Sequence, residues 1–260
     1  MHTGTGALTG YLDVAQVVLY AFWAFFAGLI YYLRREDKRE GYPLISDRSD
    51  RVTVQGFPPI PRPKTFRLPH GGTVQAPRRD GRTEPPIHAK PVASFPGAPL
   101  QPTGNPMRDA VGPASYAERE DKPEFTIDGL PLIVPLRVAV DAYVAPEDPD
   151  PRGMAVFGAD GKLAGTVQDI WVDRSEPQVR YLEVALAGGT GKAVLLPITM
   201  ALVRGDKRRV EVNAILASQF AEAPTVKNPD QVTKLEEDRI TAYFASGYLY
   251  ATRERSEPLL

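Results

Sequence analysis

The sequence predicts a single transmembrane α-helix near the N-terminus, then a mainly β cytoplasmic domain, a small antiparallel barrel, with a C-terminal helix. Three observations support this fold class: one apolar run is as long as a bilayer is thick, short strands separated by turn residues fill the second half, and a helical pattern lies near the end. The expected division is 1–11 before the membrane, 12–33 within it, 34–115 as a basic, proline-rich extended surface segment, and 116–260 as the barrel domain with its helix.

The apolar run covers residues 14–33, and Gln16 is its only strongly polar side chain. At about 1.5 Å of rise per residue, a helix of this length reaches about 30 Å, the thickness of a bilayer core. No basic residue precedes the run, and four follow it closely: Arg34, Arg35, Lys38 and Arg39. Basic residues collect on the cytoplasmic side, so we expect a periplasmic N-terminus and a cytoplasmic main domain. A signal peptide would carry its positive charges before the run. An all-round apolar helix flanked by a basic cluster is rarely a buried core helix, so a membrane span is favoured.

Charge is distributed unevenly although the formal net charge is only -1. Residues 34–90 carry 13 basic and 7 acidic side chains, whereas residues 91–260 carry 18 basic and 24 acidic ones. A basic region next to the membrane suits an anionic surface, so we expect lipid headgroups to contact Arg34, Arg35, Lys38 and Arg39. The acidic remainder argues against a nucleic-acid partner. The chain has no cysteine, which excludes disulfides and metal sites held by thiolates, and we expect no metal site.

Proline is concentrated in the segment that follows the apolar run. The 260 residues include 26 prolines, against an average usage of about 5%, and most lie between residues 42 and 113. Closely spaced prolines exclude a helix and a central strand, so an extended path is predicted. A disordered linker is the alternative, but it would not need the apolar residues Ile60, Phe66, Leu68, Val74, Ile87, Val92 and Phe95. We therefore expect an extended chain that lies on another protein and is ordered by that contact.

Short strands are predicted from about Gly153 onward. The dipeptide Asp160-Gly161 stands between apolar runs and predicts a β-hairpin, and residues 178–187 alternate between apolar and charged side chains. Closely spaced strands of this kind indicate a small antiparallel barrel or sandwich. Residues 232–243 have a helical period, with Thr233 as the expected N-cap and Glu236 at the capping-box position.

Several long motifs resemble the H-subunit family of purple-bacterial photosynthetic reaction centres. They are YYLRREDKREGYPL after the apolar run, then PKTFRLPHGG, PTGNPMRDAVGPASYAER, DIWVDRSE and RYLEV, in the family's order. The distal domain is similar to the PRC-barrel, a small β-barrel module. The resemblance implies a non-catalytic subunit in a bacterial photosynthetic (chromatophore) inner membrane. Such a subunit caps the cytoplasmic face of the L and M subunits, stabilises the quinone region and assists proton transfer to the secondary quinone during light-driven cyclic electron transport.

The resemblance also implies where the cofactors are. This chain alone is expected to hold none, whereas the complex contains bacteriochlorophyll, bacteriopheophytin, quinones and non-haem iron on its other subunits. Antenna polypeptides, a cytochrome subunit and membrane lipids are further expected partners. A membrane-tethered PRC-barrel adaptor for another assembly is the alternative. The motifs between the membrane helix and the barrel favour the reaction-centre interpretation, because a barrel tether would not require them.

Proton delivery across a buried interface needs ionisable groups within about one water of each other. The densest group of charged residues contains Asp169, Asp173, Arg174, Glu176, Arg180 and Glu183. The resemblance places Asp173, Glu176 and Arg180 among the family's interfacial acid and base residues near the proton route, and Glu176 is the principal candidate. The alternative is a solvated loop between two strands.

Some family members carry surface histidines where protons are taken up, near the position of Asp128. Here the local sequence is TIDGLPLIV, which has no histidine. Proton uptake that depends on histidine is therefore in doubt, and Asp128 is the candidate for a carboxylate that takes up protons instead, with Glu124 and Glu120 upstream.

Overall fold

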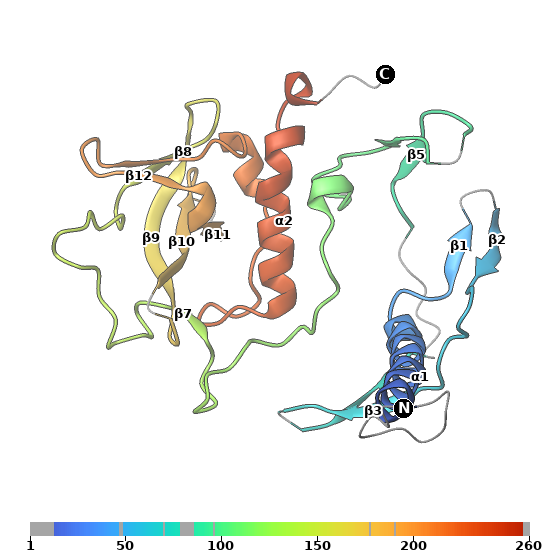
Figure 1. The fold of residues 1–260 in the computed structure, drawn as a ribbon. Helices are drawn as coiled ribbons and strands as arrows, with labels where there is room; N and C mark the ends of the chain where they lie inside the picture. Colours follow the sequence, from blue (N-terminus) through green and yellow to red (C-terminus); the bar gives the residue numbers. More distant parts are fainter. Residues whose placement is uncertain are drawn as a thin grey trace. The chain divides into compact units, whose positions relative to one another are not determined.

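The computed structural model describes residues 13–46, 49–69, 71–78, 86–95, 97–176, 178–189 and 191–256 (Figure 1). The chain divides into two compact units. The first comprises Met1–Pro85 with Phe95–Gly97, and the second comprises Pro86–Ser94 with Ala98–Leu260. The expected periplasmic residues 1–11 lie outside the described part of the chain.

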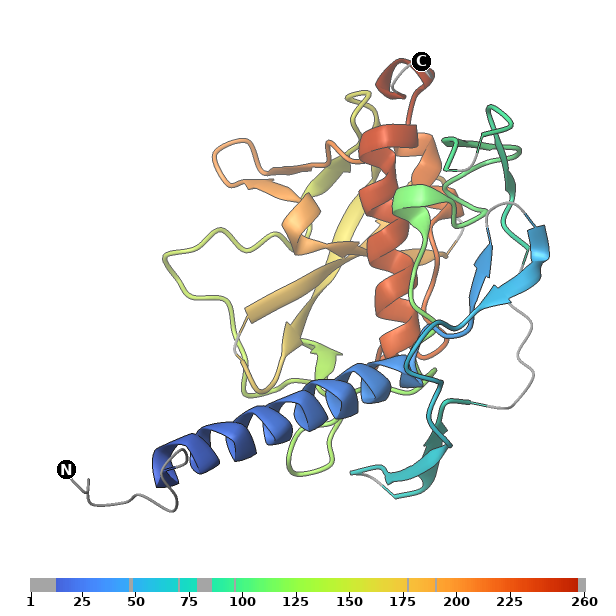
Figure 2. The ribbon, with the colours of Figure 1, turned by 45° about the vertical axis from the view of Figure 1, so that its right-hand side comes forward.

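The first unit contains the long helix α1 (Val14–Glu36), which continues into a 3-10 turn, η1 (Asp37–Arg39) (Figure 2). Its N-terminus is closed by a capping box. The Asp13 carboxylate accepts a hydrogen bond from the Gln16 backbone N–H at 2.8 Å, and the Gln16 side chain accepts one from the Asp13 backbone N–H at 3.3 Å. The single polar side chain of the apolar run thus satisfies an end of the helix, where backbone groups lack partners. The 26 residues Val14–Arg39 are long and apolar enough to cross a membrane.

The proline-rich part of the first unit is extended, with two short antiparallel ribbons. Strand β1 (Leu44–Ser46) pairs with β2 (Ser49–Val54), and β3 (Lys64–Arg67) pairs with β4 (Thr73–Ala76). Between the ribbons, residues 55–63 have neither helix nor strand. Prolines in this stretch remove backbone donors and fix φ, which explains why pairing stops there.

Seven strands of the second unit form one sheet in the order β11-β10-β9-β8-β13-β12, with β7 paired to β9. Their bounds are β7 (Ile133–Pro135), β8 (Ala155–Phe157), β9 (Leu163–Asp173), β10 (Gln178–Leu186), β11 (Ala193–Pro197), β12 (Leu202–Arg204) and β13 (Arg209–Glu211). All pairs are antiparallel except β13 with β8. The predicted hairpin at Asp160-Gly161 joins β8 to β9, and Gly161 has the positive φ of 69° that such a turn requires. A separate ribbon pairs β5 (Ala89–Pro91) with β6 (Leu100–Pro102).

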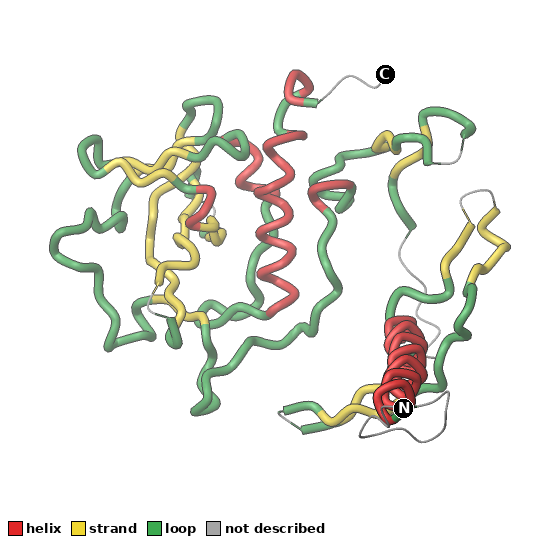
Figure 3. Tube along the Cα trace, in the orientation of Figure 1, coloured by secondary structure: helices red, strands yellow, loops and turns green. Residues whose placement is uncertain are grey.

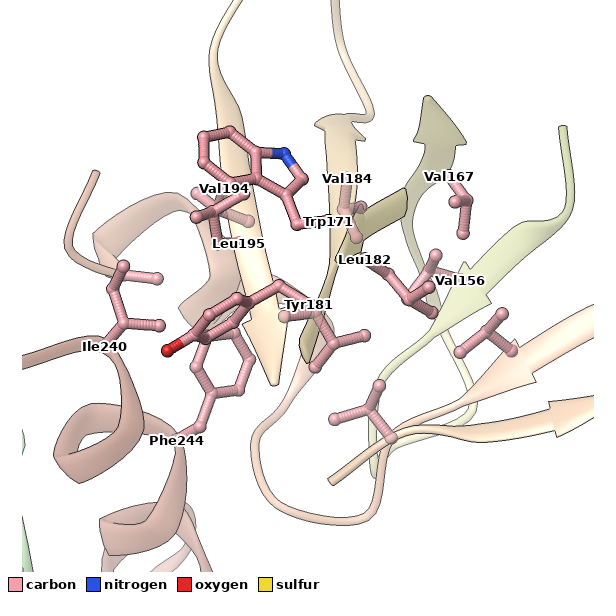
Figure 4. Close-up of a cluster of buried hydrophobic side chains, with 14 of the residues drawn as sticks. Val156, Val167, Trp171, Tyr181, Leu182, Val184, Val194, Leu195, Ile240 and Phe244 are labelled. Atoms are coloured by element: carbon pink, nitrogen blue, oxygen red, sulfur yellow. The ribbon is translucent and has the colours of Figure 1, made fainter. Parts of the chain in front are cut away.

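The core of the second unit combines side chains of the sheet with those of helix α2 (Lys234–Tyr250), shown in red in Figure 3. Both faces of the β9–β10 pair are buried. Trp171 lies opposite Tyr181 on one face and Ile170 lies opposite Leu182 on the other, and all four side chains are almost completely inaccessible to solvent. Figure 4 shows Trp171, Tyr181 and Leu182 with Ile240 and Phe244 of α2 in one cluster. At Gly247 a Cβ would lie 2.3 Å from the Ala214 carbonyl oxygen, so only glycine allows this close approach.

Helix α2 begins where the sequence predicts and extends seven residues beyond the predicted end. The Thr233 hydroxyl accepts from the Glu236 backbone N–H at 3.2 Å, and the Glu236 carboxylate accepts from the Thr233 backbone N–H at 2.9 Å. Four 3-10 turns complete the unit: η2 (Gly112–Ala114), η3 (Ile198–Met200), η4 (Ala217–Glu222) and η5 (Arg253–Arg255). The predicted fold class is confirmed: an apolar N-terminal helix, a mainly β domain and a C-terminal helix.

Candidate functional site

Beside the end of β9, the surface of the second unit carries a hollow of about 740 Å³. Its lining includes Leu130, Val138, Val140, Tyr143, Asp173 and Arg174. Two of the apolar side chains are almost fully open to solvent, Val140 at 84% and Tyr143 at 81%, and nearby Ile127 is completely so. Exposed apolar residues grouped in this way are typical of surfaces that bind a partner.

Arg174 holds the two segments that form the walls of the hollow. Its backbone N–H donates to the Leu132 carbonyl at 3.0 Å, and its guanidinium lies 3.4 Å from the Pro131 carbonyl and 3.5 Å from the Val138 carbonyl. The Arg174 side chain therefore adds to the pairing of β7 with β9 in fixing the segment 130–138 to the end of β9. The hollow is a built feature of the barrel edge.

Asp173 organises the turn that follows β9. Its buried carboxylate accepts hydrogen bonds from the backbone N–H groups of Ser175 at 2.9 Å and Glu176 at 3.1 Å. The second carboxylate oxygen pairs with Arg180 at 3.4 Å. An aspartate that accepts from the N–H groups two and three residues ahead stabilises a tight turn. Asp173 thus fixes the backbone at Glu176 and also the guanidinium of Arg180.

Glu176 itself is exposed, at the tip of the connection between β9 and β10. Its carboxylate lies 3.4 Å from the Gln178 amide nitrogen, and within the described part of the chain no cation pairs with it. Asp128 is also exposed, on a turn closed by hydrogen bonds from the Thr126 N–H to the Leu130 carbonyl at 2.8 Å and from the Gly129 N–H to the Thr126 carbonyl at 2.9 Å. The structure therefore brings Asp173, Glu176 and Arg180 together, and Asp128 lies on the turn whose Leu130 lines the same hollow.

Glu237 of α2 belongs to this cluster and was missed from the sequence. Its nearly buried carboxylate lies 3.4 Å from Arg180, and it accepts a hydrogen bond from the Tyr181 hydroxyl at 3.2 Å. Figure 4 shows that hydroxyl turned toward α2. Burial raises the pKa of Glu237, an effect that the Arg180 charge opposes, and burial raises the pKa of Tyr181 as well. The sequence did contain a sign that Glu237 is buried, because it stands three residues before Ile240 and therefore lies on the apolar face of the helix.

Asp169 and Glu183 do not join this cluster. The register of β9 and β10 places them directly opposite each other, an arrangement that is unfavourable for two like charges. Arg137 resolves it, because one guanidinium nitrogen lies 3.0 Å from Asp169 and 2.8 Å from Glu183. Glu183 also accepts a hydrogen bond from the Trp171 indole at 2.8 Å. The charged group predicted from the sequence is therefore two networks, one closed by Arg137 and one open at Glu176.

Two protein-family models match the chain. Residues 6–138, just over half of the chain, match the family model described as the photosynthetic reaction centre H-chain N-terminal region. The chain belongs to the reaction centre H-chain family. Residues 147–219 match the PRC-barrel domain, which covers strands β8 to β13 of this H chain. The predicted family is thus confirmed. The H chain is a structural component of a reaction centre, and its apolar helix α1 makes it a membrane-anchored protein.

The four basic residues of the H chain that were expected at lipid headgroups divide into two pairs. Lys38 is only 3% exposed, and its ammonium donates to the backbone carbonyls of Gln55 and Pro58, the latter at 2.7 Å. Arg39 donates to the carbonyls of Arg62 at 2.9 Å and Ala76 at 2.8 Å. These two side chains hold the chain's own proline-rich segment. Arg34 and Arg35 make no such contact in the described residues.

Glu36, the last residue of α1, also takes part in the contacts between the helix end and the proline-rich segment. Its carboxylate pairs with Arg39 at 2.8 Å and with Lys64 of β3 at 2.6 Å. We call the contacts of Glu36, Lys38, Arg39 and Lys64 the helix-end network. The proline-rich segment is thus ordered in part by the end of its own membrane helix, in addition to any partner on which it lies.

Proposed function

We propose that this H chain caps the cytoplasmic face of the L and M subunits, stabilises the quinone region and assists proton transfer to the secondary quinone during light-driven cyclic electron transport. One observation carries the proposal. Acid and base side chains border an exposed apolar hollow at the end of β9, so that a protein covering the hollow would bring them into an interface. A surface that served only as a contact would not need the exposed carboxylate of Glu176 on the turn that Asp173, a lining residue of the hollow, stabilises.

The basic residues after α1 support the orientation in this proposal. They follow the apolar run and none precedes it, which favours a periplasmic N-terminus and a cytoplasmic barrel. In that orientation the barrel is on the side where the reduced secondary quinone takes up protons. Bacteriochlorophyll, bacteriopheophytin, quinones and non-haem iron would belong to the partner subunits.

Each residue of the open network has a distinct role in the proposal. Glu176 is the proton carrier, because its carboxylate is exposed and lacks a neutralising cation in the described structure. Asp173 and Arg180 are positioning residues, since Asp173 holds both the Glu176 backbone and Arg180. Asp128 is the carboxylate that takes up protons from solvent. A proton carrier needs an ionisable group within about one water of the next group on the route, and an exposed carboxylate in an interface can meet that need.

A photo-crosslinking experiment tests the cap directly. Tyr143 would be replaced by p-benzoylphenylalanine in the native host, with Lys207 replaced in the same way as a matched control on the β12–β13 turn. We expect light to link position 143, but not position 207, to the L or M subunit. Links from position 143 only to proteins outside the reaction centre would reject the cap and support the tethered adaptor for another assembly.

A further inference from the structure

The region where α1 leaves the apolar run contains a cationic site that the helix-end network does not use. Arg34 is 62% exposed, and its nearest carboxylate, on the equally exposed Asp37, lies 3.8 Å away. Exposed pairs at such a distance contribute little, about 0–1 kcal/mol. The charge of Arg34 is therefore available to a ligand.

Arg35 is half-buried, and its Nε is the one buried side-chain nitrogen or oxygen without a hydrogen-bond partner among the described residues. Leaving such a donor unsatisfied costs about 1–3 kcal/mol. An external acceptor would remove this cost. A guanidinium presents its N–H groups in a planar fork that fits the oxygens of a phosphate.

The adjacent acid does not neutralise this pair of arginines. Glu36 is already paired with two cations, Arg39 at 2.8 Å and Lys64 at 2.6 Å. Lys38 adds a further buried positive charge whose hydrogen bonds go to neutral carbonyls. The end of α1 therefore carries an excess of positive charge, which selects an anion.

Aromatic side chains place this charge at the depth of lipid headgroups. The ring of Tyr31 lies 5.8 Å from that of Phe57, which is 81% exposed. Aromatic rings collect at the membrane–water boundary, and Arg35 follows Tyr31 by about one helical turn. An anion bound by Arg35 would therefore lie among the headgroups, beside rings that suit the glycerol and upper acyl region.

We propose that Arg34 and Arg35 bind the phosphate of an anionic phospholipid at the end of α1. The proposal rests on the membrane anchor and is independent of the proton-transfer role. It also narrows the lipid contact expected from the sequence to two of the four basic residues, because the helix-end network uses Lys38 and Arg39.

The test is a lipid count on the purified reaction centre complex. Complexes with wild-type chain, Arg35→Gln, the double variant Arg34→Gln/Arg35→Gln, and the control Arg78→Gln would be washed in detergent and their phospholipids quantified by mass spectrometry. Arg78 is an exposed basic residue of the same unit. We expect Arg35→Gln and the double variant to lose about one anionic phospholipid per complex, and Arg78→Gln to lose none. Proteolysis of residues 54–78 should be unchanged, which shows that the helix-end network is intact.

Two results would overturn the proposal. One is equal retention of anionic phospholipid by all four complexes. The other is a loss shared equally between anionic and zwitterionic lipids, which indicates a nonspecific change in the lipid belt. Inorganic phosphate, titrated into the delipidated wild-type complex, should not prevent rebinding of the anionic lipid from vesicles. If millimolar phosphate blocks it, the site binds free phosphate. A crosslink from position 35 to a protein subunit with an unchanged lipid count would assign Arg35 to a protein contact instead.

Discussion

Two charged networks lie on the same pair of strands, and they differ in whether their charges are satisfied. At Asp169 and Glu183, Arg137 pairs with both carboxylates, and Trp171 donates to one of them. At the end of β9, Asp173 and Arg180 are paired, but the exposed Glu176 has no cation among the described residues. The closed network has a structural explanation, because Arg137 neutralises two like charges that the register of the strands places opposite each other. In the open network Asp173 stabilises the turn after β9, but the exposed carboxylate of Glu176 has no comparable structural role. This difference is the reason why we propose Glu176, and not Asp169 or Glu183, as the proton carrier.

Removing Arg137 should have the largest effect on stability. Arg137→Met leaves two mostly buried carboxylates facing each other, so we expect a loss of about 2–3 kcal/mol in the free energy of unfolding. The measurement is urea unfolding of the purified chain in detergent, followed by circular dichroism. Arg152→Met is the matched control, because the exposed Arg152 pairs with Asp150 and its loss should cost less than about 1 kcal/mol. The Arg137→Met effect should be largely reversed by adding Asp169→Asn and Glu183→Gln; no reversal would show that Arg137 acts through packing.

Glu176→Gln, in contrast, should leave the free energy of unfolding unchanged to within about 0.5 kcal/mol. Function should suffer, because the amide cannot carry a proton. We expect proton-coupled reduction of the secondary quinone in the purified complex, followed by flash spectroscopy, to slow by at least about tenfold. Glu222→Gln, an exposed carboxylate on η4, should leave the rate unaltered. Wild-type kinetics in Glu176→Gln would return the turn after β9 to the role of a solvated loop.

Glu237 couples the open network to pH. Burial raises its pKa above the ordinary value of 4.5, so the folded protein holds this proton more tightly than the unfolded chain does. The stability that the neutral carboxyl contributes is present below the unfolded pKa and is lost as pH rises through the folded pKa. As pH rises above the ordinary pKa of 4.5, Glu237→Gln should therefore gain stability relative to wild type, measured by urea unfolding at each pH. If the free energies of unfolding of the two proteins changed with pH in parallel, the pKa of Glu237 would not be raised by folding.

Asp128→Asn should have the smallest effect. Its side chain is exposed on a turn that backbone hydrogen bonds close, so stability should not change. We expect slower flash-induced proton uptake, most visible at high pH, where protons are scarce. Uptake that is unchanged at every pH tested would remove Asp128 from the proton route.

The parts of the fold that were predictable from the sequence depend on local patterns. The apolar run predicts α1, Asp160-Gly161 predicts a hairpin, and Thr233 with Glu236 predicts the start of α2, each to within a few residues of its observed position. The networks were not predictable, because they depend on strand register and on contacts between distant residues. Arg137 lies 32 residues from Asp169 along the chain, and Lys38 reaches carbonyls 17 and 20 residues away. No local pattern shows whether a basic residue after a membrane helix faces lipid or its own backbone.

The central claim is that this chain caps a pigment-bearing core, and a spectrum tests it most directly. The chain would be tagged in its native host, and purified from gently solubilised membranes. The near-infrared absorption would then be recorded before and during illumination. We predict co-purified bacteriochlorophyll whose absorption bleaches reversibly in light. A colourless preparation that retains other partner proteins, from cells shown to be making photosynthetic complexes, would contradict the account.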